Sequence, residues 1–164
     1  MTTLSSVFDR LETLIAKRAP NLVEVWPEPA TTDELGAAAE ALGRPLPAEL
    51  EALLRIHNGS DEQYVLFARW DLLSTETIVS EHKLNIEAID DWDATCTPFA
   101  GDGSGNFLVV DSSGAVREAA NDGEPWEVHS AGSITELLSR FADELEAGRV
   151  VRDEERDCYH WQGY

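Results

Sequence analysis

Histidine and cysteine are the side chains of this chain best suited to catalysis or metal binding, and they are few and scattered. The four histidines are His57, His82, His129 and His160, and the two cysteines are Cys96 and Cys158. Cys158 and His160 are close in sequence, but such a pair falls short of the four ligands of a structural zinc site. Cys96 stands between two threonines with no base nearby in sequence, which is typical of a structural thiol. We therefore expect no catalytic residues, no metal, no cofactor and no enzymatic activity.

A glycine-rich loop, residues 102–106, is the second place where chemistry could occur. Its sequence is Asp-Gly-Ser-Gly-Asn, and it leads into the apolar run 107–110. A phosphate-binding loop needs a lysine and a following helix, and this loop has neither. It copies the first half of a calcium-binding loop, but the twelfth position is Ser113 in place of the bidentate glutamate. The loop therefore predicts a turn between two strands, without a phosphate or calcium site.

Net charge is the strongest signal in the composition. The 164 residues include 32 Asp and Glu against 12 Lys and Arg, which gives a formal net charge of −20. Such a surface repels nucleic acids and anionic lipids, and it speeds the encounter with basic proteins. The composition favours a basic protein partner over nucleic acid or a membrane surface. The alternative is that the acidity only keeps the protein soluble.

One acidic run contains a large aromatic residue, and we take it as the candidate partner-binding site. Asp90, Asp91 and Asp93 flank Trp92. In one interpretation Trp92 turns into the core and the aspartates are solvated, as is usual for large aromatics. In the other, Trp92 is an exposed anchor surrounded by charges that attract a partner. Asp102 in the glycine loop extends the acidic surface in this second interpretation.

The length and the end segments predict the organisation of the chain. We expect one domain over residues 1–164, with a core at about 30–148 and a charged, aromatic tail at 149–164. The first residues lack the basic start and apolar run of a signal peptide, and no apolar stretch is long enough to span a membrane. Both cysteines are expected to be free thiols. These features predict a cytoplasmic protein, monomeric or weakly dimeric.

Apolar periodicity and capping residues predict an α+β fold. Helical patterns occupy residues 4–15, 31–43, 47–59, 74–89 and 133–148, and strand patterns occupy 64–67, 95–100, 106–111, 115–119 and 126–130. Because the strands do not alternate with helices, we expect N-terminal helices and a C-terminal helix packed on a largely antiparallel mixed sheet. Phe107–Val110 has no polar face and is expected to be the buried central strand. The helix at 74–89 is expected to face inward through Ile78, Val79, His82, Ile86 and Ile89.

Three segments resemble the SUKH superfamily, also known as the yeast cell-wall regulator and killer-toxin-resistance family. The first runs from Leu46-Pro47 to His57-Asn58-Gly59, and it is similar to a helix of the family that ends in Asn-Gly. The second is the Trp-Asp-Leu-Leu-Ser corner at 70–74. The third is the proline-started strand, glycine loop and aspartate-ended strand at 98–111. The resemblance covers about residues 30–148.

The resemblance implies a binding protein without catalytic activity. Bacterial members of the family are widely interpreted as immunity proteins, which bind and neutralise toxins that are often nucleases or deaminases. Fungal members act in cell-wall signalling through protein contacts. The resemblance implies an immunity protein that binds a toxin domain, and the acidic composition favours a basic one. A regulatory or scaffold adaptor without a toxin partner is the alternative.

Overall fold

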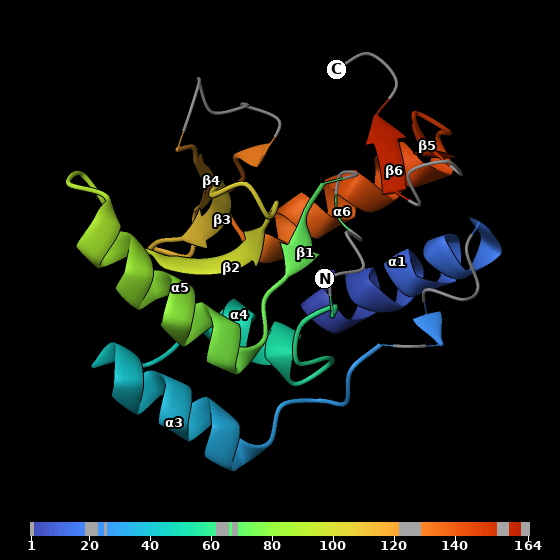
Figure 1. Cartoon of the computed structure of the whole chain (residues 1–164). Coiled ribbons are helices and arrows are strands. Elements are labelled where there is room, and N and C mark those ends of the chain that lie inside the picture. The colour runs from blue at the N-terminus through green and yellow to red at the C-terminus, as the bar shows by residue number, and fades with distance from the viewer. Residues whose placement is uncertain are drawn as a thin grey trace.

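Five helices and six strands are seen in the computed structural model, which is described over residues 2–18, 23–24, 26–61, 66, 69–121, 129–153 and 158–161. The helices are α1 (Leu4–Arg18), α3 (Thr32–Leu42), α4 (Ala48–Leu54), α5 (Thr75–Ala88) and α6 (Ile134–Glu146). The strands are β1 (Asp71–Leu72), β2 (Thr97–Gly101), β3 (Phe107–Val110), β4 (Val116–Ala119), β5 (Val150–Asp153) and β6 (Cys158–Trp161). Figure 1 shows helices around the sheet, which confirms the predicted α+β class.

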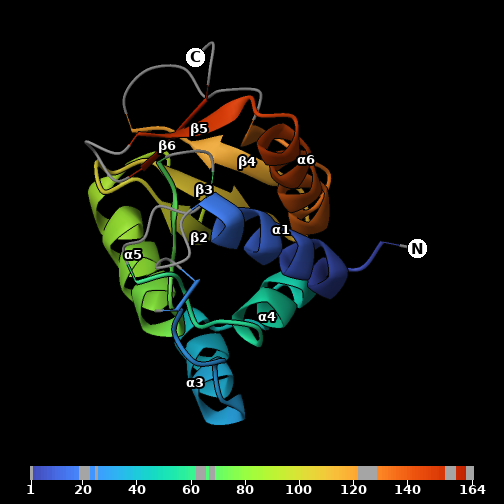
Figure 2. The ribbon, with the colours of Figure 1, turned by 90° about the vertical axis from the view of Figure 1, so that its right-hand side faces the viewer.

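The main sheet has the order β1-β2-β3-β4, and each neighbouring pair in it is antiparallel. The sheet, which was predicted to be largely antiparallel, is antiparallel across these four strands. All residues of β3 are buried, as its apolar sequence predicted. In Figure 2 the strands β2, β3 and β4 lie between α5 on one side and α1 and α6 on the other. Helices on both sides explain why β3 needs no polar face.

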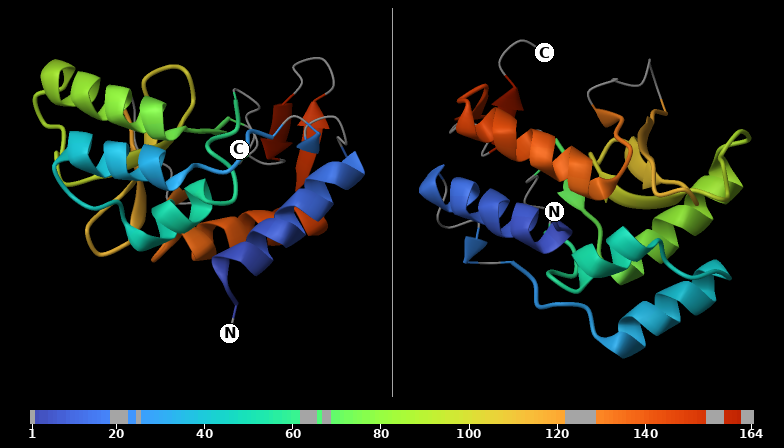
Figure 3. Two further views of the ribbon diagram at one scale, coloured as in Figure 1. Left: turned by 90° about the horizontal axis from the view of Figure 1, so that it is seen from below. Right: turned by 180° about the vertical axis from the view of Figure 1, so that it is seen from behind.

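Two amphipathic helices from distant parts of the chain lie side by side behind the sheet (Figure 3). The apolar stripe of α1 and the apolar face of α6 are both buried in the core. Arg10 of α1 donates to Asp143 of α6 at 2.8 Å and also pairs with Glu146. These groups are exposed, so the ion pairs add little, and the packing is held mainly by apolar burial.

The helix ends follow the predicted capping residues closely. Thr31 and Glu34 form a reciprocal capping box at the start of α3, and Gly43 ends that helix with a φ of +69°. Ser74 and Ser133 cap α5 and α6 through their hydroxyl groups. The helical range of 47–59 predicted for this segment is longer than α4. Pro47 is its N-cap residue and lies before its first turn, and the helix ends at Leu54, well before the Asn-Gly pair.

The inner face of α5 differs from the prediction at one apolar position. Ile78 and His82 are buried as expected, but Asn85 is also buried while Ile86 is 46% exposed. An α-helix turns about 100° per residue, so Asn85 lies about 20° from Ile78 and Ile86 about 80° from it. The angular position of a residue around the helix therefore determines whether its side chain faces the sheet. Asn85 is buried for this reason, although Ile86 is the more apolar residue.

Parts of two predicted strands lie outside the described residues. Of the strand expected at 64–67, Leu66 is described, and it forms an isolated bridge with Trp70. Of the strand expected at 126–130, His129 and Ser130 are described, and neither belongs to a strand. The tail contains a hairpin formed by β5 and β6, which was not predicted from the sequence.

The three segments that carry the family resemblance meet at one corner of the sheet. Ser60, just after the Asn-Gly pair, exchanges hydrogen bonds with Leu72, because its N–H donates to the Leu72 carbonyl at 2.9 Å and its Oγ accepts from the Leu72 N–H at 2.8 Å. Asn58 Oδ1 accepts from the Thr75 N–H at 2.8 Å, at the start of α5. The Leu73 N–H donates to the Phe99 carbonyl in β2 at 2.9 Å. The corner thus joins α4, β1, β2 and α5.

Gly59 lies at the closest approach in this corner, and Gly59→Ala is expected to be destabilising. Its φ is +90°, and an added Cβ would lie 2.8 Å from the Ser74 nitrogen and 2.9 Å from the Leu72 oxygen. Both neighbours are backbone atoms, so the corner must shift, and we expect a loss of about 2–4 kcal/mol from strain and overlap. Gly36→Ala is the matched control, because Gly36 is helical with open space around it, and it should gain about 0.5–1 kcal/mol. Urea unfolding of both variants measures the difference, and equal stabilities would contradict this description of the corner.

Candidate protein-binding surface

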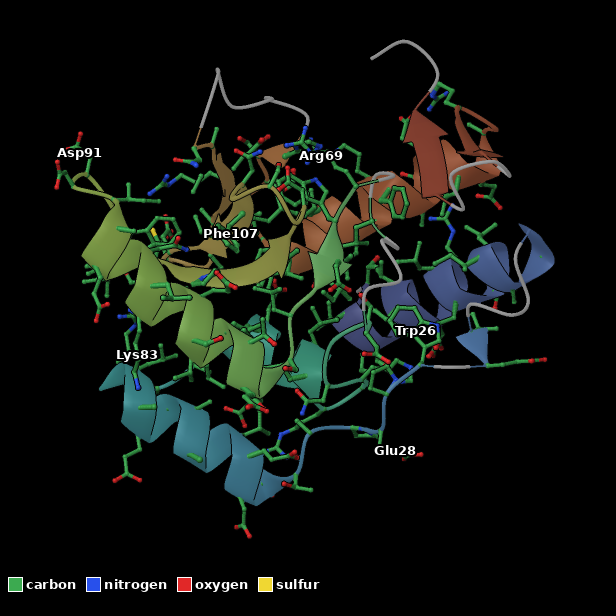
Figure 4. The ribbon with its side chains drawn as sticks, viewed as in Figure 1. Trp26, Glu28, Arg69, Lys83, Asp91 and Phe107 are labelled. Atoms are coloured by element: carbon green, nitrogen blue, oxygen red, sulfur yellow. The ribbon has the colours of Figure 1, made fainter. Side chains whose placement is uncertain are left out.

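The acidic run Asp90–Asp93 forms the turn that follows α5. Asp90 and Asp91 are exposed, and Figure 4 shows Asp91 at the outer tip of this turn. Asp93 is exposed but fixed, since its Oδ1 accepts from the Thr95 hydroxyl at 2.6 Å and from the Thr95 N–H at 3.0 Å. Together with the Cys96 thiol, these donors lower the pKa of Asp93 to about 2. The turn therefore carries three negative charges at neutral pH.

Trp92 lies partly inside the protein, in agreement with the first of the two interpretations. Its ring packs edge-on against Phe107 of β3, with ring centroids 6.1 Å apart at an interplanar angle of 86°. The indole ring is intermediate in exposure and contacts the core. The Trp92 ring therefore forms a wall, in the sense of an aromatic surface that separates the core from the turn. It does not project from the protein surface as an exposed anchor.

A cleft of about 250 Å³ opens beside this wall, between the turn and β4, and we call it the Trp92 cleft. Its apolar lining comes from Ile89, Trp92, Val109 and Ala119. Its polar lining includes Asp91, Asp93, Arg117 and Asn121. Val109 is paired with Arg117 and Phe107 with Ala119, so these side chains share the face of the sheet that carries Trp92.

Arg117 is the basic side chain among the polar residues that line the Trp92 cleft. Its guanidinium lies 3.4 Å from Asp93 Oδ2 and 3.3 Å from the sulfur of Cys96. Both members of the ion pair are about half exposed. A long, exposed pair of this kind contributes at most about 1 kcal/mol. Arg117 was not among the candidate residues taken from the sequence, because its place depends on the pairing of β4 with β3.

Asp102 has a different role from the other aspartates of the candidate site. Its carboxylate is only 7% exposed and accepts from the Asn106 amide at 2.8 Å and from the Ser104 N–H at 2.9 Å. Burial raises the pKa of Asp102, but these hydrogen bonds outweigh it and the pKa is lowered overall. Asp102 also pairs with Arg69 at 3.1 Å. It closes the glycine loop and adds no charge to the exposed surface.

A buried polar network extends from this loop on the opposite side of β4. Glu118 accepts from Arg69 at 3.1 Å and from Nδ1 of His129 at 2.7 Å. The Nε1–H of Trp70 donates to Nε2 of His129 at 3.4 Å, and the Arg69 guanidinium lies 4.7 Å from the centre of the Trp70 ring. Burial lowers the pKa of His129 despite the neighbouring carboxylate of Glu118. The side chains of His129 and Glu118 are 0% and 2% exposed, so this network joins structural elements and is closed to a partner.

The remaining candidates for chemistry also have structural partners. Cys96 is a free thiol, 2% exposed, and burial raises its pKa. His57 contacts the Pro27 carbonyl at 2.8 Å and Glu12 at 2.9 Å, and it stacks on Trp26. Within the described residues, no group of three or more His, Cys, Asp or Glu side chains is arranged to hold a metal ion. No helix in the same part of the chain is long and apolar enough to cross a membrane.

His82 on α5 provides a pH-dependent check of the α5 packing. It is 4% exposed, and burial together with the charge of Arg44 lowers its pKa below 6.5. At pH values between the lowered folded-state pKa of His82 and its unfolded-state pKa of about 6.5, the histidine is protonated in the unfolded chain and neutral in the folded protein. The free energy of unfolding therefore falls as the pH falls through this range. Relative to His82→Gln, the wild type should lose stability as the pH is lowered from about 6.5 toward the folded-state pKa, by up to about 1.4 kcal/mol per pH unit. Calorimetric melting of both proteins measures this gap, and a gap independent of pH would contradict the buried neutral histidine.

Comparison with known protein families tests the resemblance that was inferred from the three sequence segments. The model of the SMI1/KNR4 family (SUKH-1) matches residues 29–147, which include α3 to α6 and the whole four-stranded sheet. The chain therefore belongs to the SMI1/KNR4 family, and the resemblance inferred from its three segments is confirmed. No curated protein matches the sequence significantly.

Proposed function

We propose that this chain is a non-catalytic cytoplasmic immunity protein that neutralises a basic protein toxin by direct binding. The observation that carries the proposal is the net charge of −20 combined with the way the basic residues are used. Arg10, Arg55, Arg69, Arg117 and Arg149 each pair with a carboxylate of this chain. Because acidic residues outnumber basic ones by 20 and these five arginines are already paired within the chain, the surplus carboxylates determine the field outside the protein.

This field favours a protein partner with a basic surface. Exposed carboxylates lie on several elements, including Glu40 on α3, Glu76 and Glu87 on α5, and Asp90 and Asp91 on the turn. Such charge increases the association rate with a basic protein and opposes approach to nucleic acid. Nuclease toxins are suitable partners on this argument, because a protein that grips phosphates presents lysine and arginine. Covering that surface would block the toxin's access to its substrate.

The test is capture of the partner followed by a neutralisation assay. The tagged chain is used to isolate a basic protein from native lysate, and the purified partner is assayed for toxic activity with and without an equimolar amount of this chain. Immunity predicts a stable complex and loss of the partner's activity. A stable complex with a partner that has no toxic activity would favour the regulatory adaptor instead. Capture of no basic partner would contradict both forms of the proposal.

A further inference from the structure

We propose that the Trp92 cleft is the socket for a single arginine side chain of the partner. This inference rests on the proposed function, because it names the group through which a basic partner is recognised. The cleft joins an aromatic wall, aliphatic side chains and carboxylates within one concave site.

The size and lining of the cleft fit one side chain better than a free metabolite. Its volume of about 250 Å³ is below the range of roughly 300–1,000 Å³ that is usual for small-molecule sites. Ile89, Val109 and Ala119 give apolar contacts for a methylene chain, and Trp92 gives an aromatic surface. Arginine combines such a stem with a planar cation that associates with aromatic rings. Arginine is also enriched at the centres of protein interfaces, where it contributes much of the binding energy.

The charges around the cleft select a cation. Asp91 lines the cleft from the tip of the turn, and it is exposed in the unbound protein. Asp93 also lines it, and the two hydrogen bonds from Thr95 fix its carboxylate in place. A fixed carboxylate binds a guanidinium at little cost in side-chain entropy. The neighbouring residue Asp90 is also exposed but does not line the cleft, which makes it a natural control.

Arg117 shows that a guanidinium can occupy this environment. It contacts Asp93 and the Cys96 sulfur at distances at the long end of hydrogen bonding, and its side chain is 47% exposed. The partner's arginine would compete with Arg117 for Oδ2 of Asp93, which also accepts from the Cys96 thiol at 3.3 Å. Removal of the Arg117 charge should therefore strengthen binding of an added guanidinium, which a purely structural role of the cleft would not do.

The experiment is a titration with a small probe, followed by NMR. The probe is Nα-acetyl-arginine methylamide, and the matched neutral probe is Nα-acetyl-citrulline methylamide. The signal is the indole N–H resonance of Trp92, which is assigned by its absence from the Trp92→Phe variant. We expect a saturable shift of this resonance with the arginine probe and none with the citrulline probe. Equal shifts with both probes, or no shift with either, would overturn the proposal.

Charge variants test which residues hold the probe. Asp91→Asn should weaken binding about threefold, and Asp90→Asn should leave it nearly unchanged although the net charge changes equally. Arg117→Gln should strengthen binding about threefold. Its control is Arg55→Gln, because Arg55 has the same exposed fraction as Arg117, pairs with Glu51 on α4 at 2.8 Å and does not line the cleft. Equal effects of Asp91→Asn and Asp90→Asn, or of Arg117→Gln and Arg55→Gln, would show that only the overall charge matters. Either result would overturn the proposed arginine socket.

Failure of the socket is distinguishable from failure of the proposed function. The probe titration uses no partner protein, so it reports on the cleft alone. If the chain neutralises a toxin while the arginine probe leaves the Trp92 resonance unchanged, the function stands and the cleft is not the socket. If the probe binds as expected but the chain captures no basic partner, the immunity function is wrong, and with it the role of this cleft in partner recognition.

Discussion

Leu108→Asp is expected to abolish the cooperative unfolding transition of the domain. Leu108 is 0% exposed in the central strand, where it pairs with Ala100 on one side and Glu118 on the other. The substitution loses the leucine's burial, worth about 2–5 kcal/mol, and places a carboxylate where burial costs several kcal/mol more. The two losses together are comparable with the entire stability of a typical domain, about 5–15 kcal/mol.

The measurement is thermal unfolding followed by circular dichroism. Leu84→Asp is the control, because it introduces the same charge at a leucine that is 55% exposed on α5. The control should melt like the wild type, while Leu108→Asp should show no transition. A cooperative transition near the wild-type temperature for Leu108→Asp would show that the central strand is misplaced.

Glu118→Ala is expected to give the second largest loss of stability. Glu118 accepts from both His129 and Arg69, and its side chain is 2% exposed. Removing Glu118 takes the carboxylate acceptor from buried His129 and one of the carboxylate partners from Arg69, which costs about 3–5 kcal/mol. For a domain of this size, that loss lowers Tm by about 10 °C.

Two controls separate the network from the general effect of losing a carboxylate. Glu118→Gln keeps the volume and one acceptor oxygen, so its loss should be smaller. Asp90→Ala removes an exposed carboxylate and should change stability by no more than about 0.5 kcal/mol. Urea unfolding of the three variants gives the comparison. Equal stability of Glu118→Ala and Asp90→Ala would contradict the buried network.

Local signals in the sequence predicted the helix ends and the central strand well. Capping depends on a few neighbouring residues, so Thr31, Ser74 and Ser133 were readable before any tertiary structure was known. The apolar run of β3 likewise identifies a strand that is covered on both sides. The family resemblance was carried by residues that meet at one corner, where Gly59 needs a positive φ.

The candidate site was predicted only in part, because its geometry depends on contacts between distant residues. The acidic turn was visible in the sequence, but the Trp92 cleft also needs Val109 and Arg117, which strand register brings to the same face. Asp102 was grouped with the exposed aspartates by residue type. Its pairing with Arg69 and its place inside the glycine loop follow from the fold of the sheet.

Association kinetics between this chain and its captured basic partner test the central claim most directly. The rate constant is measured by stopped-flow at increasing ionic strength for the wild type and for Asp90→Lys/Asp91→Lys, in which both exposed charges are reversed. We expect the wild-type rate to fall as salt screens the attraction, and we expect the variant to associate more slowly with a weaker salt dependence. Identical rates and salt dependence for the two proteins would contradict recognition through the acidic turn.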